Sequence, residues 1–387
     1  MLLGAALAAG LIVGMQVPLL HPQSRGHLDL TNLQLAGGAT APVDWPATGT
    51  AAVIIPSLGV AEGWHDHVVP IASLTKMMTA YVTLAHLPLA LGGTGPCVFI
   101  NDADVALANY MKSDGQSYVE VAVGERLCEI DLLGGLLVHS ANNFALILAT
   151  MVAGTPERFV ALMNSTATQL GLLHTHYVEP SGYKAGSVST ALEQGRLAVI
   201  LMRSALVRSI VAMASITLPV AGTVDSFTPY VGTNDVVGVK SGRTLAAGGC
   251  VVMAMTFAQG ASTQTLYAVV LGQRGGDVLS AAGDAALALA NSARDNQVLQ
   301  VFTRGVAVGT IGWGTRRTSV VIARTQAIWR WAGTSHLPVR LHLRHFDSII
   351  HRGEVVGWLG VLGASEHRLA LVAKGSASPP TMLQRLR

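Results

Sequence analysis

The sequence predicts an α+β fold, because a long helical region separates one early strand from several late strands. The early strand is the apolar run GTAAVIIPS at 49–57. Helical periodicity dominates much of 70–210. Apolar runs typical of strands then return between 235 and 273, as DVVGVKSG, GGCVVMAMTF and TLYAVVLGQ. We expect the early strand to join these late ones in one antiparallel sheet.

Within this α+β region, the segment TPERFVALMNSTATQLG at 155–171 carries its own helix start and stop signals. Thr155 is a good N-cap, and Pro156 suits the first helical position, where a missing N–H costs nothing. Apolar residues follow at helical spacing until Gly171 ends the pattern. A further helix, VLSAAGDAALALANSA at 278–293, closes the region. We therefore place one main domain at 46–297.

Residues 300–387 change to an all-β pattern. In LPVRLHLRH, Val339, Leu341 and Leu343 alternate with polar neighbours, which is the period of a half-buried strand. The segments GEVVGWLGVLG and HRLALVA add further strand signal. Residues 301–387 also hold 12 Lys and Arg against 3 Asp and Glu, within a whole-chain net charge of +3. We predict a small, basic, β-rich C-terminal domain.

The first 20 residues contain no charged side chain and are apolar over a length that suits a signal peptide or a membrane anchor. Residues 21–45 are rich in Gly, Pro, Ala and Thr, which predicts a linker. We therefore expect an exported protein. Half of the 387 residues are hydrophobic and only 12% are charged, which excludes a disordered chain.

The cysteines and histidines indicate no metal site and no other cofactor. Cys97 and Cys128 flank one segment and could pair in an oxidising compartment or stay reduced, and the sequence leaves both alternatives open. Cys250 lies in an apolar run and is expected to be a buried free thiol. The histidines of the HDH and HTH motifs lack Cys or carboxylate partners at ligand spacing, so we interpret them as surface or packing residues.

Ser73 and Lys76 in IASLTKMMTAYVTLAHL are the first candidates for chemistry. Pro70 is expected in the first turn of a helix, and residues three apart then share one face, so the amine can reach the hydroxyl. The apolar neighbours should desolvate Lys76 and lower its pKa, which would let it act as a base.

A second S-x-x-K copy, SGYK, starts at Ser181 and ends at Lys184. It follows Pro180 and contains Gly182, so we predict a loop with a solvated lysine and no catalytic role.

Two further motifs follow along the chain. VHSANNFA places Ser140 and Asn142 at a break between two apolar helices, and VGVKSGRT places Lys240, Ser241 and Gly242 on a strand. Taken singly, each motif is better explained as a structural feature, the first as a helix-capping turn and the second as a strand end. In the order S-x-x-K, S-x-N, K-[S/T]-G, the three motifs are the active-site set of penicillin-recognising acyl transferases.

At these residues the chain resembles the low-molecular-mass penicillin-binding proteins, the serine D-alanyl-D-alanine carboxypeptidases. The similarity covers about residues 45–295 and includes connecting segments such as GERLCEIDLLGGLLVHSANNFA. IHRGEVVGWLGVL is similar to the small β domain that often follows. The resemblance implies a β-lactamase/transpeptidase-like fold, with an antiparallel sheet, helices on both faces and a helical subdomain.

The resemblance also implies a role for each motif residue. Ser73 would attack the carbonyl of the penultimate D-alanine, with Lys76 as its base, and form an acyl-enzyme. Ser140 would relay a proton to the departing amine, and Asn142 would hold the substrate amide. Three positions depart from the commoner family pattern: Ser241 in place of threonine, Asn143 in place of aspartate, and the bulky Arg243.

Substrate recognition follows from the third motif in the same way. Lys240 and Ser241 would bind the terminal carboxylate of the substrate. The backbone N–H groups of Ser73 and of Arg243, the residue after Gly242, would form the oxyanion hole. Arg274, in LGQRGG, is a further candidate contact for the carboxylate.

The expected partners are a peptidoglycan stem peptide as substrate and β-lactams as covalent inhibitors. No nucleic-acid recognition motif accompanies the basic C-terminal region, so we expect it to face an anionic membrane or wall polymer, or to act as a spacer.

The alternative functions are a D,D-endopeptidase, a class A-like β-lactamase and an inactive penicillin-binding sensor or scaffold. Glu179 invites the lactamase reading, but EPSGY lacks the E-x-x-L-N pattern of that loop. The intact motif residues argue against the scaffold.

Overall fold

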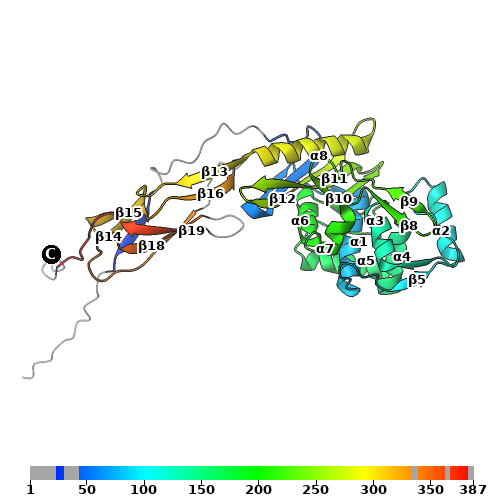
Figure 1. Cartoon of the computed structure of the whole chain (residues 1–387), viewed down its shortest axis with the longest axis horizontal. Coiled ribbons are helices and arrows are strands. Elements are labelled where there is room, and N and C mark those ends of the chain that lie inside the picture. Colours follow the sequence, from blue (N-terminus) through cyan, green and yellow to red (C-terminus); the bar gives the residue numbers. More distant parts are fainter. Residues whose placement is uncertain (1–22, 30–42, 333–338, 362–366, 382–387) are drawn as a thin grey trace, which may run out of the picture.

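The computed structural model describes residues 23–29, 43–332, 339–361 and 367–381. The helices and a five-stranded sheet lie at one end of the molecule, and a second sheet lies at the other (Figure 1). A two-stranded ribbon and the end of helix α8 (Val278–Asp295) lie between them. The predicted α+β arrangement is confirmed. The predicted export segment at 1–20 lies outside the described residues.

The five-stranded sheet joins the early strand to the late strands, as the sequence predicts. All its neighbouring strands are antiparallel, and β2 pairs with β12 in the interior of the sheet. The order is β10 (Val236–Thr244), β11 (Gly248–Gln259), β12 (Ser262–Gln273), β2 (Thr50–Ile55) and β3 (Val60–Trp64).

Both faces of this sheet are covered, which explains why every residue of β2 is buried. Ala51, Val53 and Ile55 belong to a hydrophobic cluster shared with α8. Ala52 and Ile54 alternate with them and belong to the larger cluster of the other helices. The predicted layering, a sheet between helices on both faces, is therefore present.

The helical region begins where the sequence predicts it and carries the predicted caps. The side chain of Thr155 accepts a hydrogen bond from the N–H of Arg158, and Gly171 follows the helix with a φ of 73°. The helices are α1 (Thr75–His86), α2 (Asp102–Ser113), α3 (Glu129–Leu137), α4 (Asn142–Ala153), α5 (Pro156–Gln169), α6 (Ala191–Leu201) and α7 (Ala205–Val211).

Three short antiparallel pairs connect these helices. The pairs are β4 (Val69–Pro70) with β7 (Val188–Ser189), β5 (Cys97–Phe99) with β6 (Arg126–Cys128), and β8 (Ser215–Leu218) with β9 (Gly222–Asp225). No single helix in the described ranges is long and apolar enough to cross a membrane; α4 and α5 reach that length only together, and they are bent by 84°.

The C-terminal region is all-β, as predicted. A ribbon of β13 (Gln297–Phe302) and β16 (Gln326–Trp331) leads into it, and the Nε1 of Trp331 donates to the carbonyl of Ala293 in α8 at 3.1 Å. The main sheet has the order β1 (Arg25–Leu28), β14 (Ala307–Trp313), β15 (Arg316–Ile322), β19 (His367–Ala373), β18 (Val355–Val361) and β17 (Val339–Leu343).

The linker predicted for 21–45 needs a correction, because part of it is a strand. β1 (Arg25–Leu28) pairs with β14 from Arg25 opposite Gly312 to Leu28 opposite Gly309. Glycine and polar residues hid this strand, since an exposed edge strand need not alternate apolar side chains. Residues 25–28 are therefore part of the C-terminal sheet.

A disulfide joins Cys97 and Cys128, which face each other in the register of β5 and β6. The pairing was one of two alternatives open from the sequence. It closes a loop of 31 residues that contains α2. Cys250 is buried and free, as expected.

Replacing both disulfide cysteines by serine should lower the free energy of unfolding by about 3 kcal/mol, because the open chain gains loop entropy in the unfolded state. Urea unfolding of the oxidised wild type and of Cys97→Ser/Cys128→Ser measures this difference. Reductant should lower the midpoint of the wild type and leave that of the double variant unchanged. Equal midpoints for the two oxidised proteins would contradict a stabilising bridge.

Candidate active site

Ser73 lies on a single 3-10 turn, Ala72–Leu74, directly before α1. Pro70 is not in the first turn of that helix, which corrects the prediction; it lies in β4, whose pairing with β7 fixes the chain just before the turn. Ala72 has a φ of 48°, in the left-handed region that few non-glycine residues adopt. The position of Ser73 is therefore set by this turn and by β4 before it. It is not set by the first turn of a helix.

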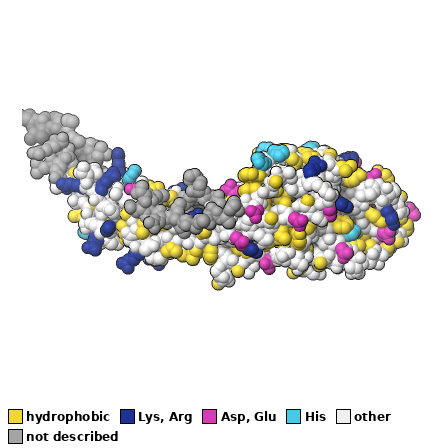
Figure 2. Space-filling model, turned by 90° about the horizontal axis from the view of Figure 1, so that it is seen from above, with side chains coloured by type: hydrophobic (Ala, Val, Ile, Leu, Met, Phe, Trp, Pro, Cys, Tyr) yellow, Lys and Arg dark blue, Asp and Glu magenta, His cyan; other side chains and the backbone are white. Residues whose placement is uncertain are grey.

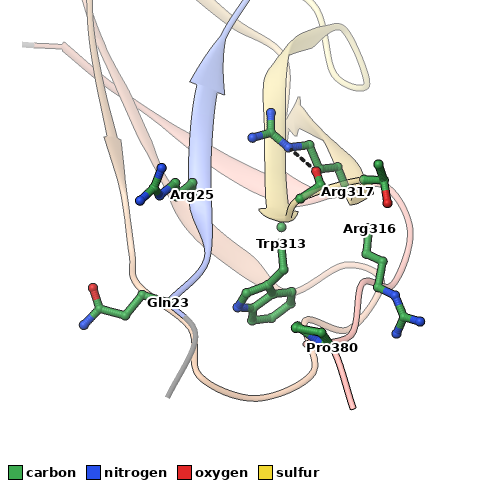
Figure 3. Close-up of a pocket in the computed structure, with 9 residues that line it drawn as sticks. Gln23, Arg25, Trp313, Arg316, Arg317 and Pro380 are labelled. Carbon is green, nitrogen blue, oxygen red and sulfur yellow. Dashed lines mark hydrogen bonds between the residues drawn. The ribbon is translucent and has the colours of Figure 1, made fainter. Parts of the chain in front are cut away.

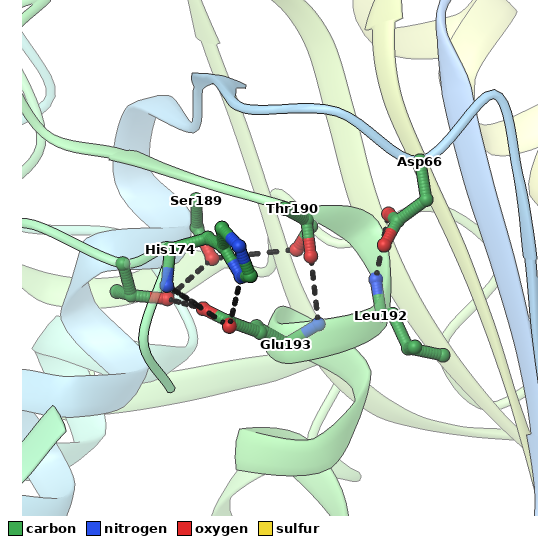
Figure 4. A network of polar contacts seen from close by, with 7 residues as sticks. Asp66, His174, Ser189, Thr190, Leu192 and Glu193 are labelled. Carbon is green, nitrogen blue, oxygen red and sulfur yellow. Dashed lines mark hydrogen bonds and ion pairs between the residues drawn. The ribbon is translucent and has the colours of Figure 1, made fainter. Parts of the chain in front are cut away.

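The buried carboxylate of Glu193 is linked to Ser189 of β7 by a network of hydrogen bonds (Figure 4). Glu193 accepts hydrogen bonds from the N–H and the Nδ1 of His174 and from the hydroxyl of Thr175. The Thr175 hydroxyl also meets the Ser189 hydroxyl at 2.7 Å, on β7 itself. His174 is exposed, in agreement with the expected surface position of the HTH histidines. Through β7 and β4, this network supports the turn that carries Ser73.

Lys76 is fully buried and lies one helical turn after Ser73, as predicted. Its Nζ is 2.8 Å from the Ser73 Oγ, 2.6 Å from the Asn142 Oδ1 and 2.8 Å from the Ser181 carbonyl oxygen. Burial holds the pKa of Lys76 well below its ordinary value. The positive charge of Lys240 lowers the pKa further, and Glu179 opposes this shift. A neutral amine in this position can accept the hydroxyl proton.

Ser140 and Asn142 lie at the predicted break between α3 and α4. Ser140 has a φ of 63°, is 3% exposed, and makes no side-chain hydrogen bond to any described residue. Asn142 is the first residue of α4, and its Oδ1 faces Lys76. The break therefore brings the second motif to the amine of the first motif.

Asn143 departs from the commoner aspartate for a structural reason. Its Oδ1 accepts from the N–H of Val119 at 3.1 Å, and its Nδ2 donates to the carbonyl of Val119 at 2.9 Å. A carboxylate could accept the first bond but could not donate the second. Asn143 thus fixes the loop after α2, which also carries Gln116.

Gln116 is a site residue that the sequence analysis missed. Its Oε1 accepts from the Asn142 Nδ2 at 2.7 Å, and its Nε2 donates to Asp114 at 2.8 Å. With its amide nitrogen held in this way, Asn142 presents oxygen to Lys76. A glutamine in a polar loop has no motif, so nothing in the local pattern predicted this contact.

The third motif lies on β10, at the edge of the five-stranded sheet. Lys240 is fully buried; its Nζ donates to the Ser241 carbonyl at 2.8 Å, and burial lowers its pKa to about 7. The Ser241 hydroxyl donates to the Phe227 carbonyl at 2.7 Å. A Cβ atom at Gly242 would lie 2.6 Å from the Ser73 nitrogen, so glycine is what lets β10 approach the turn that carries Ser73.

Arg243 and Arg274 lie together on the wall of a cavity of about 770 Å³, which also contains Tyr183. The Arg243 guanidinium is 67% exposed and lies 4.0 Å from Asp277. Arg274 donates to the carbonyls of Leu245 and Ala246 at 2.9 Å each, so it holds the loop between β10 and β11. The contact of Arg274 with a substrate carboxylate stays a prediction.

The second S-x-x-K copy is a loop, and Lys184 is exposed, as predicted. Ser181, however, is buried, and its carbonyl is the third hydrogen-bond partner of Lys76. The Glu179 carboxylate accepts from the hydroxyl of Ser181 and from the N–H groups of Ser181, Gly182 and Lys184. Both oxygens of Glu179 thus accept hydrogen bonds within this loop. This removes the main argument that Glu179 activates a water molecule for deacylation, as a carboxylate does in class A β-lactamases.

Among the residues that the structure describes, no group of three or more His, Cys, Asp and Glu side chains lies close enough to hold a metal ion.

Residues 60–275 match the Peptidase_S11 family, described as D-alanyl-D-alanine carboxypeptidase. The chain belongs to this family. Among curated relatives of this S11 member, a D-alanyl-D-alanine endopeptidase of Escherichia coli is 30% identical over 234 residues, which are 56% of the chain and 70% of the relative. A D-alanyl-D-alanine endopeptidase of Pseudomonas aeruginosa is 38% identical over 135 residues, 35% of the chain and 40% of the relative.

A third S11 relative, a D-alanyl-D-alanine carboxypeptidase of Escherichia coli, is 33% identical over 144 residues, 37% of the chain and 36% of the relative. The chain thus spans well under half of the length of two of these three relatives.

Solved structures confirm the predicted fold. Penicillin binding protein 5 from Haemophilus influenzae has a TM-score of 0.63 at 19% identity, over 89% of this chain and 100% of that chain. The Streptomyces K15 DD-transpeptidase has a TM-score of 0.56 at 23% identity, over 64% of this chain and 98% of that chain. The S11 member therefore has the penicillin-binding transpeptidase fold, and the first of these matches extends into its C-terminal sheet.

Gln116→Leu should slow acylation by a fluorescent penicillin about tenfold, because one hydrogen bond that orients Asn142 is lost. The rate constant for acylation under single-turnover conditions measures this effect. Gln169→Leu, the same change at an exposed position of α5, is the control and should leave the rate unchanged. A wild-type rate in Gln116→Leu would show that Asn142 needs no such support.

Lys240 should make stability depend on pH. An unfolded lysine keeps its proton up to about pH 10.5, whereas the pKa of folded Lys240 is about 7. Between these values the unfolded state binds more protons, so the free energy of unfolding should rise with pH, by up to about 1.4 kcal/mol per unit. Urea unfolding between about pH 7 and pH 8.5 tests this. Lys240→Met should give a flatter slope, and an equal slope would contradict the burial of its charge.

Proposed function

We propose that this protein is a serine D-alanyl-D-alanine carboxypeptidase that removes the terminal D-alanine from peptidoglycan stem pentapeptides. One observation carries the proposal: the fully buried Nζ of Lys76 lies 2.8 Å from the hydroxyl of Ser73. A lysine with a lowered pKa beside a serine is the arrangement that activates a nucleophile without a histidine. Family membership and the order of the three motifs support the same activity.

Acylation begins when Lys76 accepts the Oγ proton of Ser73. The Oγ bonds to the carbonyl carbon of the penultimate D-alanine, and negative charge develops on the carbonyl oxygen. The backbone N–H groups of Ser73 and Arg243 would stabilise this charge, which the close approach of Gly242 to the Ser73 nitrogen supports. The bond from carbon to the amide nitrogen then breaks, and the acyl group stays on Ser73.

The departing nitrogen needs a proton, and Lys76 now holds one. Ser140 would pass it on, because its buried hydroxyl has no other described partner and lies on the break that faces Lys76. D-alanine leaves as a neutral amine that takes up its usual charge in water. In deacylation, water gives a proton to Lys76 and attacks the ester, and the Ser73 Oγ takes that proton back as it leaves.

Recognition of a free terminal carboxylate distinguishes a carboxypeptidase from other peptidases. Lys240 and Ser241 would supply a positive charge and a hydroxyl beside the nucleophile. In the free protein burial lowers the pKa of Lys240 to about 7. A bound carboxylate would favour the charged form of the lysine, because opposite charges in a desolvated site attract strongly.

β-Lactams would acylate Ser73 in the same way, and the acyl-enzyme would persist. Slow release follows from the position of Glu179, whose oxygens are occupied by the loop at 181–184 and are not available to activate water. We place the protein at the outer face of the bacterial cytoplasmic membrane or in the periplasm, anchored or secreted, as the apolar 1–20 segment suggests.

A D,D-endopeptidase is the second candidate. One curated relative with that name is matched over 70% of its own length. An endopeptidase would have to accept a cross-linked peptide beyond the scissile bond, in the cavity of about 770 Å³ beside Arg243. The two activities share the acyl-enzyme and differ in the leaving group.

Intact mass after benzylpenicillin should show one covalent adduct on the wild type and none on Ser73→Ala, because that variant lacks the nucleophile. Ser181→Ala, in the other S-x-x-K copy, is the matched control and should still be acylated, because the carbonyl that contacts Lys76 remains. An adduct on Ser73→Ala, or rapid release of hydrolysed penicillin, would overturn the proposal.

The substrate is then identified by two assays. The wild type should release D-alanine from a soluble stem pentapeptide faster than it splits a D,D-cross-linked dimer of stem peptides. The reverse preference would select the endopeptidase. Acylation by penicillin without activity on either peptide would indicate a sensor or scaffold.

A further inference from the structure

A cavity of about 650 Å³ lies around the turn between β14 and β15. These two strands lie at the opposite end of the molecule from α1, the helix that follows Ser73 (Figure 1). Three arginines line it, and Trp313 lies between them (Figure 3). Among the residues that the structure describes, no acidic side chain is part of its wall. The lining residues are Gln23, Arg25, Gly312, Trp313, Gly314, Thr315, Arg316, Arg317 and Pro380.

The strand register builds this cluster from two parts of the chain. Arg25 on β1 is opposite Gly312 on β14, and Gly312 is opposite Arg317 on β15. Directly opposed residues point to the same face of a sheet, so the two arginines flank a position that has no side chain. Strand spacing puts their Cα atoms about 10 Å apart. One anion can therefore reach both guanidinium groups.

Gly312, between the two arginines, cannot carry a side chain, because the neighbouring backbone leaves no room for a Cβ atom. A Cβ at Gly312 would lie 2.1 Å from the Arg316 carbonyl oxygen and 2.8 Å from the Arg317 Cα. The next register pair is Trp313 with Arg316, and the two-residue turn Gly314–Thr315 follows. Successive register positions point to opposite faces of a sheet, so Trp313 and Arg316 point to the face opposite Arg25 and Arg317. The cavity is lined from both faces and therefore extends around the end of the hairpin.

The positive charge of the cluster is not neutralised within the described chain. The Arg25 and Arg316 guanidinium groups make no hydrogen bond or ion pair with a described residue. Arg317 donates to the carbonyl of Gly314 at 3.0 Å and to the hydroxyl of Thr310 at 3.3 Å, which orients it without neutralising it. Planar guanidinium groups with several open N–H donors match phosphate oxygens closely.

The position of the cavity favours a lipid headgroup as the source of the phosphate. Gln23 and Arg25 come directly after an apolar stretch of some 20 residues that has no charged side chain. Such a stretch is long enough to cross a bilayer, and basic residues next to it lie at the headgroup level. Basic side chains gather over this end of the molecule, while acidic ones lie mainly over the helical body (Figure 2).

We propose that Arg25, Arg316 and Arg317 form a binding site for the phosphate of an anionic phospholipid headgroup. The site docks the end of the C-terminal sheet on the membrane surface. The catalytic domain is then held at the far end of the molecule, at the distance set by the second sheet and the β13–β16 ribbon. The inference is independent of the proposed peptidase activity.

Vesicle binding by the full chain tests the site. The apparent dissociation constant is measured on neutral phosphatidylcholine vesicles and on vesicles that also contain phosphatidylglycerol. The ratio of the two constants cancels the contribution of the uncharged N-terminal segment. We expect the wild type to prefer anionic vesicles about 100-fold, since each basic residue near such a surface contributes roughly fivefold. Arg25→Gln/Arg316→Gln/Arg317→Gln should abolish that preference.

The matched control removes the same charge elsewhere on the C-terminal region. Arg304, Arg324 and Arg352 are exposed and do not line the cavity. Arg304→Gln/Arg324→Gln/Arg352→Gln should keep most of the preference for anionic vesicles. The far-UV circular dichroism spectrum and the urea unfolding transition should be unchanged in both triple variants, which shows that they fold. If the first triple variant does not fold, Arg25→Gln/Arg316→Gln replaces it, because neither side chain bonds to a described residue.

Three results would overturn the proposal. The wild type could bind neutral and anionic vesicles equally, or the two triple variants could lose equal affinity, which would mean that only net charge matters. A soluble poly(glycerol phosphate) chain could bind to the wild type more tightly than the anionic vesicles and lose that binding in the first triple variant. That last result would assign the arginines to a wall polymer in place of the membrane.

Discussion

The burial of the Lys76 amine is the constraint on which the active site depends. Moving an ammonium group out of water is expensive, so the neutral form is favoured and the pKa falls. A neutral amine still needs hydrogen-bond partners, and the fold supplies three: the Ser73 hydroxyl, the Asn142 side chain and the Ser181 carbonyl. Burial thus favours the neutral form of this amine, which is held against a single hydroxyl.

Separate elements converge on this amine, and each is fixed by a contact of its own. The β4–β7 pair and the Glu193 network support the Ser73 turn. Gly242 lets β10 pack against that turn and brings Lys240 close enough to lower the pKa of Lys76. The α3–α4 break delivers Ser140 and Asn142. The site is therefore a meeting point of the sheet and the helical region, and loss of one support should loosen the others.

The sequence predicts the fold class, the closeness of Ser73 to Lys76 and the two ends of α5, because these depend on local spacing and on turn residues. It did not predict contacts made by backbone atoms or by residues without a motif. The Ser181 carbonyl is 105 residues from Lys76, and Gln116 is 26 residues from Asn142. Sequence pattern predicts a linker where Arg25–Leu28 forms an edge strand, since the strand pairs with residues far along the chain, Arg25 with Gly312. Such long-range pairings leave no periodic trace.

The most direct test of this account is the pH dependence of the rate constant for acylation by benzylpenicillin. The rate should rise with pH along a single apparent pKa well below the ordinary lysine value of 10.5 and then level off. Lys76→Arg, which keeps the positive charge, should abolish the rise and lower the rate by orders of magnitude, because arginine cannot release its proton. An apparent pKa at the ordinary lysine value, or a wild-type rate in Lys76→Arg, would contradict the assignment of Lys76 as the base.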